Sequence, residues 1–599
     1  MIDLLASLDL MCAIWAAELW YIWPGLGPWP LLLAAVGWAA SALATKTVVG
    51  RRDVNWPLVF LLFSAVGGVW IAYDRAAAWN KFWLVIGGLA LYASFVRAER
   101  IRVGRWSKIS LTSLILGVLP TVIAAYFLLF NDWTRWMGKL SWLDPAMRWF
   151  STWQPKLAGY TLNPNVTGGV IAAFLPLQIA GLRAGKRSPG LVGFSVLLVS
   201  ISALGLLMSA SRGAWLAVCI AGGAYGLWRL GGWLAQRFHF RRQRQMQAIL
   251  WVVAMAMIAS VVVGVLTQTR YGQQFLTLAQ LDRVDIWHNS LDLARDYTFT
   301  GVGLGSFEMA YSTYVLLLHV GHTFHAHNLF LDIWLELGLL GLFAFGWLVT
   351  KSVWSGRSAA RWRAAAMIAL GVILLHGLGD DAFYGYGGQA APLLFVPLAL
   401  LAGTEKKPAP GANPSAPLFS RHPVRWIAGC GITAAIALAT WQVPKLQAAF
   451  QENLGALIQT RAELSVYHWP DWPLQDVLRR SPDIDLTPAI ARYQAALVLD
   501  PDNVSANRRL GQIELSLGQY QPACRHLETA FVAAPSQRAN RQLVGECYAI
   551  SGDIESATAL WRTVDVGQSQ LVLRQWWYEY VNEQQYAARI AQAAAALQK

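Results

Sequence analysis

The sequence predicts an all-α protein with two parts, a bundle of membrane-spanning helices followed by a soluble helical domain. Of its 599 residues, 56% are hydrophobic and 14% are charged, a composition typical of membrane proteins with several spans. Apolar stretches of about 20 residues, the length that crosses a bilayer, recur from near the N-terminus to about residue 441. From Pro444 onward the chain is polar and carries an internal repeat.

These stretches define the expected domain organisation. We expect a polytopic membrane domain over residues 1–445, a connector over 446–485 and a helical repeat domain over 486–599. The apolar stretches amount to about 12 or 13 spans. The first stretch carries Asp3 and has no basic region before it, so we expect a membrane anchor there and no cleaved signal peptide.

The distribution of positive charge predicts the orientation. Lys and Arg near helix ends are retained on the cytoplasmic side of a membrane. Every second loop of this chain is basic; those loops lie around residues 46–52, 97–108, 183–187, 229–244, 351–363 and 406–425. We therefore expect a cytoplasmic N-terminus and, with an odd number of spans, an extracytoplasmic C-terminal domain. The net charge of +14 then reflects topology, and we do not expect nucleic-acid binding.

The C-terminal domain contains a repeat with a spacing of 34 residues. The recurring pairs are Pro501 and Pro535, Gly511 and Gly545, Gly518 and Gly552, and Ala523 and Ala557. This period is that of the tetratricopeptide repeat, in which small residues let two antiparallel helices approach each other. Such a domain presents a concave surface to a partner or folds back on its own protein. Cys524 and Cys547 lie in this external region, where a disulfide is chemically possible.

Polar groups that can do chemistry gather in the loops expected outside the cytoplasm. The first long loop, about residues 131–164, is rich in Trp and basic residues, which suits the lipid headgroup layer. The second spans about residues 268–326 and ends in a histidine cluster. A third, short loop brings His376, Asp380 and Asp381 to the same side.

Two arginines in these regions are candidate anion-binding residues. Arg212 follows small residues in "SASRGAWLA", which leaves room for a ligand near the backbone, although a simple interfacial position with a snorkelling side chain is an alternative. Arg283 and Trp287 lie one helical turn apart, and Asp282 or Asp285 is an alternative partner for Arg283. The following "GVGLG" lacks a βαβ context for nucleotide binding, so we interpret it as a flexible turn.

The histidines allow three interpretations. His319, His322, His325 and His327 lie within nine residues. They are too close together for one regular helix face and lack an HExxH pattern, which argues against a metal site. Surface histidines without a function are a second interpretation. The third is a neutral imidazole that acts as a general base beside arginines that bind a polyanion.

Several motifs together resemble the O-antigen ligase and O-antigen polymerase superfamily of bacterial membrane glycosyltransferases. The resemblance rests on "SASRGAWL", "RVDIWHNSL", "GVGLGSF" and "HNLFLDIWLELGLLG", with "NPNVTGGVIAAFLPL" around Asn165. In "HNLFLDIWLELGLLG", His327 and Asn328 are followed by Gly338 and Gly341 at the family's spacing. These motifs cover about residues 160–345.

The resemblance implies a function and a set of site residues. Members of this superfamily move a glycan from an undecaprenyl-diphosphate carrier onto an acceptor outside the cytoplasm, at the inner membrane, without a cofactor or a metal. His327 is implied as the base, and Arg212 and Arg283 as the groups that hold the diphosphate, with inversion at the anomeric carbon. The implied substrate-binding residues are Asn328, Trp287, His325, Asn165 and Asp380.

The acceptor stays open because the C-terminal domain departs from the typical ligase. A ligase, a polymerase and a protein O-oligosaccharyltransferase are alternatives within the superfamily, and a lipid-linked glycan transporter or a membrane-anchored scaffold are alternatives outside it. The repeats are expected to recruit an acceptor polypeptide or an envelope-assembly protein. Deleting residues 480–599 is therefore expected to leave carrier binding intact and to lower acceptor use.

Overall fold

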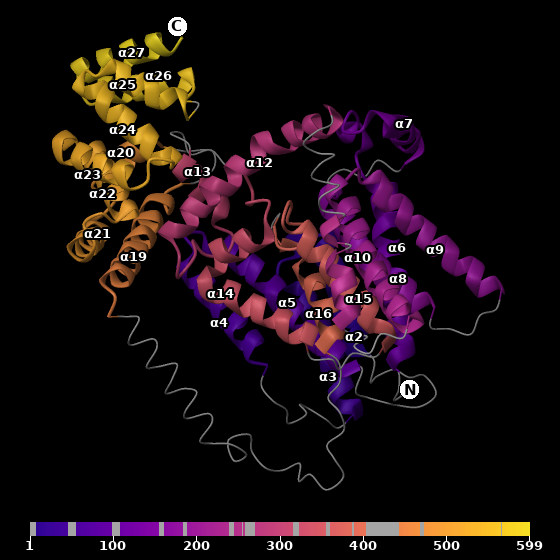
Figure 1. Cartoon of the computed structure of the whole chain (residues 1–599). Coiled ribbons are helices and arrows are strands. Elements are labelled where there is room, and N and C mark those ends of the chain that lie inside the picture. Colours follow the sequence, from indigo (N-terminus) through magenta and orange to yellow (C-terminus); the bar gives the residue numbers. More distant parts are fainter. Residues whose placement is uncertain are drawn as a thin grey trace.

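The protein forms a bundle of long helices with a smaller helical body beside it (Figure 1). This computed structural model describes residues 8–45, 55–98, 108–154, 161–183, 189–238, 245–253, 255–257, 270–315, 323–354, 360–385, 388–402, 442–467, 473–564 and 566–598. Within these ranges every regular element is a helix, as the sequence predicts. Asp3, His319, His322, much of the basic loops and the last apolar stretch, up to residue 441, lie outside the described residues.

The bundle consists of helices from the first two thirds of the chain. Its long elements are α2 (Leu8–Ile22), α3 (Trp29–Thr45), α4 (Trp56–Ile71), α5 (Arg75–Ala98), α6 (Lys108–Phe130), α8 (Pro164–Leu182), α9 (Pro189–Met208), α10 (Arg212–Arg237), α14 (Leu329–Trp354), α15 (Ala360–His376) and α16 (Ala391–Ala402). They bury one continuous apolar core. The polar connections add η1 (Pro24–Leu26), η2 (Trp133–Trp136), η3 (Ser141–Leu143), α7 (Asp144–Trp153), α12 (Arg270–Asp296) and α13 (Phe307–Val315).

Several bundle helices have the length and composition of membrane spans. Among the described residues, the spans of Thr112–Phe130, Pro164–Leu182, Pro189–Met208 and Leu329–Trp354 qualify, and five further apolar helices are shorter. Only 28% of the apolar window in α9 is buried inside the protein, and its outward side chains include Phe194 and Val196. Such a continuous apolar surface fits contact with lipid. The count of about 12 or 13 spans stays a prediction.

The glycine-rich turn after α12 is tightly packed, not flexible as we expected from the sequence. Gly301, Gly303 and Gly305 all have positive φ, which glycine adopts without a steric penalty. The backbone N–H of Val302 donates to the carbonyl of Leu335 at 2.6 Å, and that of Leu304 donates to Gly68 at 3.1 Å. The turn is therefore fixed between α4 and α14.

Gly338 kinks α14 where this turn packs against it. Its φ is +69°, and a Cβ at this position would lie 2.3 Å from the carbonyl oxygen of Phe299. Gly338→Ala is expected to lower the free energy of unfolding by at least about 1–2 kcal/mol, the cost of a left-handed conformation in a residue with a Cβ. The midpoint of thermal unfolding in detergent measures the effect.

Gly346→Ala in the same helix is the matched control, since a Cβ there meets nothing within 4 Å. We expect this control to be neutral or slightly stabilising because alanine favours helix more than glycine does. Equal stability of the two variants would contradict the steric role assigned to Gly338.

The C-terminal helical body begins at Pro444. It comprises α19 (Pro444–Leu464), α20 (Gln475–Arg480), α21 (Thr487–Leu499), α22 (Val504–Ser516), α23 (Tyr520–Ala533), α24 (Arg538–Ser551), α25 (Ile554–Arg562), α26 (Gln568–Tyr580) and α27 (Gln584–Leu597). We expected residues 446–485 to be a connector, but their described parts, 446–467 and 473–485, contain most of α19 and all of α20. α19 packs along α21, so this segment is part of the helical body.

The repeat of 34 residues corresponds to two successive helix pairs, α22 with α23 and α24 with α25. The recurring Ala523 and Ala557 are completely buried, as small residues at close helix contacts should be. The pairing therefore fits the predicted period, while assignment to the tetratricopeptide class stays a prediction. Cys524 and Cys547 form a disulfide between α23 and α24.

The C-terminal body docks on the end of α12 through a buried cluster of charges. Asp296, the last residue of α12, is 1% exposed and forms ion pairs with Arg508 and Arg509 of α22. Arg509 also donates to the Tyr297 hydroxyl at 2.9 Å. In Figure 1, α12 runs over one end of the bundle from the region of α7 toward the C-terminal body. The body therefore holds one end of the helix that carries Arg283.

Candidate active site

The loop before α14 is shaped by the cap of that helix. The Asn328 side-chain oxygen accepts hydrogen bonds from the backbone N–H groups of Phe330 (3.0 Å) and Leu331 (3.2 Å), as an N-cap residue does. Its amide donates to the carbonyl of Leu378 at 3.1 Å. Both ends of the Asn328 side chain are thus used within the protein. They join the start of α14 to the loop after α15, which carries Asp380.

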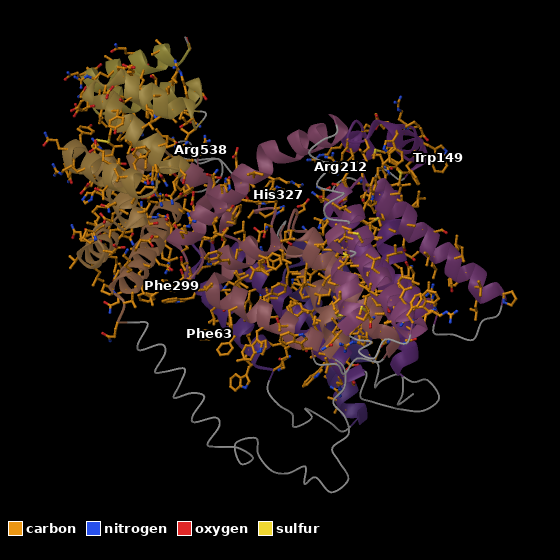
Figure 2. The ribbon with its side chains drawn as sticks, in the orientation of Figure 1. Phe63, Trp149, Arg212, Phe299, His327 and Arg538 are labelled. Carbon is orange, nitrogen blue, oxygen red and sulfur yellow. A yellow bond between two sulfur atoms is a disulfide. The ribbon has the colours of Figure 1, made fainter. Side chains whose placement is uncertain are left out.

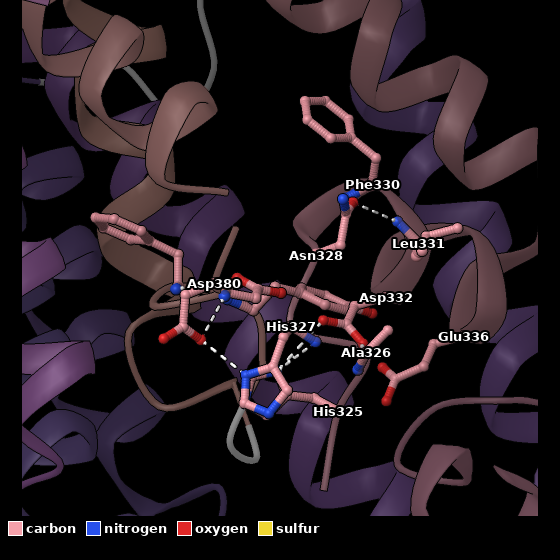
Figure 3. Close-up of polar contacts among 12 residues, drawn as sticks. His325, Ala326, His327, Asn328, Phe330, Leu331, Asp332, Glu336 and Asp380 are labelled. Atoms are coloured by element: carbon pink, nitrogen blue, oxygen red, sulfur yellow. Dashed lines mark hydrogen bonds and ion pairs between the residues drawn. The ribbon is translucent and has the colours of Figure 1, made fainter. Parts of the chain in front are cut away.

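His327 has a strained backbone conformation, and its ring is directed at Asp380 (Figure 3). Its φ is +52°, a backbone conformation that costs a residue with a Cβ on the order of 1–3 kcal/mol and that clusters at functional sites. The His327 Nδ1 lies 3.1 Å from Asp380 Oδ1. An ionised carboxylate only accepts hydrogen bonds, so Nδ1 carries the proton and the lone pair is on Nε2. This is the tautomer that a general base needs.

Asp380 joins His327 to Arg283. Its second oxygen lies 3.3 Å from the Arg283 guanidinium, and the same guanidinium donates to the carbonyl of Gly379. Burial opposes ionisation of Asp380, but the hydrogen bond from His327 and the charge of Arg283 outweigh it, so its pKa lies well below the usual value. The carboxylate therefore stays charged. Asp285, which we considered as a partner of Arg283, does not take that role.

Trp287 and His325 support His327 from two sides. The Trp287 indole N–H donates weakly to the His327 carbonyl, at 3.4 Å. The backbone N–H of His327 donates to Nδ1 of His325 at 3.1 Å. His325 is 3% exposed, and burial lowers its pKa, so its ring is neutral at neutral pH. These contacts fix the backbone of His327 and give both residues a positioning role.

Arg212 lies at the same end of the bundle (Figure 2). It is the first residue of α10 and is exposed to solvent. Ala210, two residues earlier, has a φ of +49°, so this motif also contains a strained backbone position. Snorkelling does not account for that strain. The N-terminus of α10 adds its own partial positive charge next to the guanidinium.

Lys139 is a third cation of this site, which our sequence analysis missed. Its Nζ donates to the Asn165 side-chain oxygen at 2.8 Å. Burial lowers the pKa of Lys139 to about 8; nearby Asp380 opposes this change, and Arg212 and Arg283 add to it. Lys139 is therefore within electrostatic range of both arginines. In the sequence nothing distinguishes it from the other basic residues of its loop. Asn165, in the first turn of α8, orients it.

The pKa of Lys139 predicts how anion binding depends on pH. The ammonium is charged below about pH 8 and loses its charge as the pH rises through that value. A diphosphate ligand should therefore bind more weakly above pH 8, with a KM for the donor that rises about fivefold to tenfold by pH 9.5.

Lys139→Arg is the matched variant because guanidinium keeps its charge at these pH values. It should flatten the rise in donor KM between pH 7 and pH 9.5, measured in steady-state transfer assays. An equal rise in Lys139→Arg and in the unaltered protein would exclude Lys139 as its source.

A metal site is a competing interpretation of the same residues. Possible ligand atoms of His325, His327 and Asp380 lie within 4.8 Å of one another. However, Nδ1 of His325 already accepts the His327 N–H, so in the neutral ring Nε2 carries the proton. The Arg283 guanidinium against Asp380 also repels a cation. This donor set does not fit a metal ion well, and metal independence stays a prediction.

Two further polar residues lie next to the site. Asp381 is buried, and burial followed by the nearby charge of Asp332 raises its pKa to about 8. His376, the last residue of α15, is 4% exposed, and neither of its ring nitrogens has a hydrogen-bond partner among the described residues. Its ring lies close to Gly169 of α8 and Gly213 of α10.

The structure thus brings the candidate residues to one place. Residues 197–346 match the family model of O-antigen ligase. The O-antigen ligase match contains Arg212, Arg283 and His327, whereas Lys139, Asn165 and Asp380 lie outside it. A comparison with curated proteins finds no match. The match and the apolar helices support a multi-pass membrane protein related to the O-antigen ligase superfamily.

Proposed function

We propose that this protein transfers a glycan from an undecaprenyl-diphosphate carrier to an acceptor hydroxyl on the extracytoplasmic side of the bacterial inner membrane. The observation that carries the proposal is the contact of His327 with Asp380, which also pairs with Arg283. The reaction needs a general base that takes the proton of the acceptor, and a cation that binds the diphosphate leaving group. His327 and Arg283 are placed on the two sides of Asp380 in this way. The O-antigen ligase match supports the same chemistry.

In this scheme His327 takes the proton of the acceptor, and undecaprenyl diphosphate is the leaving group. Nε2 of His327 takes the proton of the acceptor hydroxyl, and the hydroxyl oxygen forms a bond with the anomeric carbon. The bond between that carbon and the diphosphate oxygen breaks, and undecaprenyl diphosphate leaves with the electron pair. Asp380 stabilises the imidazolium that forms, as a carboxylate does in other histidine pairs. One direct displacement inverts the configuration at the anomeric carbon.

Three cations offset the charge of the leaving group. Lys139 lies within electrostatic range of Arg212 and Arg283, and Arg283 is anchored to Asp380. Guanidinium groups form charge-assisted, two-pronged hydrogen bonds with phosphate. With this much positive charge at the leaving group, the reaction has no need of a metal ion.

Release of undecaprenyl diphosphate by the purified protein in EDTA tests the proposal. The donor is a purified undecaprenyl-diphosphate glycan, and the product is analysed for the new glycosidic bond and its configuration. We expect release in EDTA, an inverted linkage and a loss of release in Arg283→Ala. Activity that appears only after a divalent metal is added would overturn the metal-free scheme. Release that persists in Arg283→Ala would overturn the assigned site.

The acceptor distinguishes the alternatives within the superfamily. A second lipid-linked glycan as acceptor would identify a polymerase, and a polypeptide acceptor would identify a protein O-oligosaccharyltransferase. The C-terminal helical body is a candidate for recruiting such an acceptor or an envelope-assembly protein. A lipid-linked glycan transporter would move the donor without releasing undecaprenyl diphosphate, so the same assay separates transport from transfer.

A further inference from the structure

A cavity adjoins the loop that carries His327. Its volume is about 490 Å³, within the range of small-molecule sites, which is about 300–1,000 Å³. It lies between the end of α2, the first turns of α5 and α13, and α14. Phe324 lines it and is three residues from His327 in the same loop. The arginines and Lys139 do not line this cavity.

A buried ion pair forms part of the cavity wall. The Lys81 ammonium of α5 lies 2.7 Å from Glu336 of α14, and the two residues are 6% and 4% exposed. Glu336 also accepts the backbone N–H of Gly305 at 3.2 Å, and the ammonium lies 4.2 Å from the centre of the Tyr384 ring. Burying two charges costs several kcal/mol for each ion, which their attraction only partly offsets. An apolar pair would fill the space at lower cost.

The charge of this wall limits which ligands fit. Because Glu336 neutralises Lys81, the cavity offers no net positive charge to a diphosphate. Glu308 at the start of α13 is the remaining carboxylate of the lining, and burial raises its pKa. The Lys81 ammonium in the same wall repels a cation. A lipid chain would supply no hydrogen-bonding groups to the polar side chains of the lining. A neutral ligand with many hydroxyl groups fits both halves of the ion pair.

The remaining lining has the chemistry of a sugar site. Asn80 and Gln389 supply amides that both donate and accept hydrogen bonds. Trp20, Phe307 and Phe324 supply aromatic surface, against which the apolar faces of a sugar ring pack. Polar groups set among aromatic and other apolar side chains are typical of ligand pockets.

We propose that this cavity binds a neutral sugar unit of one of the two substrates, with Lys81, Glu336, Asn80 and Gln389 as its hydrogen-bonding groups. The inference rests on the proposed function, since it places a glycan beside the base. None of the cations proposed to bind the diphosphate lines the cavity, so the sugar site and the diphosphate site are formed by different residues. A sugar bound here lies next to the reacting centre and is held by different helices from those that hold the carrier.

The test uses the full chain in lipid nanodiscs and the double variant Asn80→Ala/Gln389→Ala. Both side chains are only partly buried or exposed, so the fold should tolerate their loss. Gln521→Ala is the control, since it removes an exposed amide of α23, far from the cavity. KM is measured separately for donor and acceptor. Binding of two probes, the free glycan released from the donor by mild acid and the acceptor preparation, is measured without turnover by saturation-transfer NMR.

We expect the double variant to raise the KM of one substrate at least tenfold, with the corresponding loss of probe binding. The maximal rate and the affinity for undecaprenyl diphosphate should stay within about threefold of the unaltered protein. A raised donor KM identifies the donor glycan as the occupant, and a raised acceptor KM identifies the acceptor. Unchanged KM values and unchanged binding of both probes would overturn the inference. If the unaltered protein releases no undecaprenyl diphosphate, the proposed function fails, and the binding measurement still decides whether the cavity takes a sugar.

Discussion

Replacement of His327 by alanine is expected to lower the maximal rate of glycan transfer by about 100-fold to 10,000-fold, the usual contribution of a positioned general base. The Nδ1 of His327 is tied to Asp380, so Nε2 is the only ring atom left to take the acceptor proton. Donor affinity should change little, because the cations that bind the diphosphate remain in place. Initial rates of undecaprenyl diphosphate release, with donor binding measured separately, check both statements.

Asp380→Asn distinguishes a base from a merely structural histidine. The asparagine keeps the size of the side chain, but it removes the negative charge that stabilises the imidazolium and pairs with Arg283. We expect a large loss of rate together with a weaker donor affinity, whereas His327→Ala should affect the rate alone. His288→Ala, which removes an exposed histidine of α12, is the control. Full activity in His327→Ala would show that another group is the base.

Loss of Asp296 is expected to lower the free energy of unfolding by about 3–5 kcal/mol, because it leaves buried guanidinium groups without their partner. Arg508 and Arg509 are 3% and 7% exposed, so water cannot replace the carboxylate. Asp296→Asn also frees the end of α12, on which Arg283 lies 13 residues earlier, about 20 Å along the helix. We therefore expect weaker donor binding as well as a lower midpoint of thermal unfolding.

This contact changes what deletion of residues 480–599 should do. From the sequence we expected carrier binding to stay intact. However, the deletion removes Arg508 and Arg509, so Asp296 at the end of α12 loses both of its ion-pair partners. We now expect lower carrier affinity in the truncated protein. Arg525→Gln, which removes an exposed guanidinium of α23, is the control for Asp296→Asn. Unaltered donor binding in both Asp296→Asn and the truncated protein would show that the C-terminal body does not position α12.

The sequence by itself determined the helical class, the division into an apolar and a polar part, and the candidate residues that lie in short motifs. These features depend on neighbours in the chain: the length of an apolar run sets a span, and a period of 34 residues sets a helix pair. Arg212, Arg283 and His327 each lie in such a motif, so their chemistry could be inferred without coordinates.

The tertiary structure decided which groups act together. Asp380 lies 53 positions from His327, Glu336 lies 255 from Lys81, and Arg508 lies 212 from Asp296. No local pattern marks Lys139 as the cation beside both arginines, or predicts that the Asn328 amide bonds to Leu378, 50 positions later. Ion pairs and caps between distant segments form only when packing brings the segments together and removes water, and that packing depends on the whole chain.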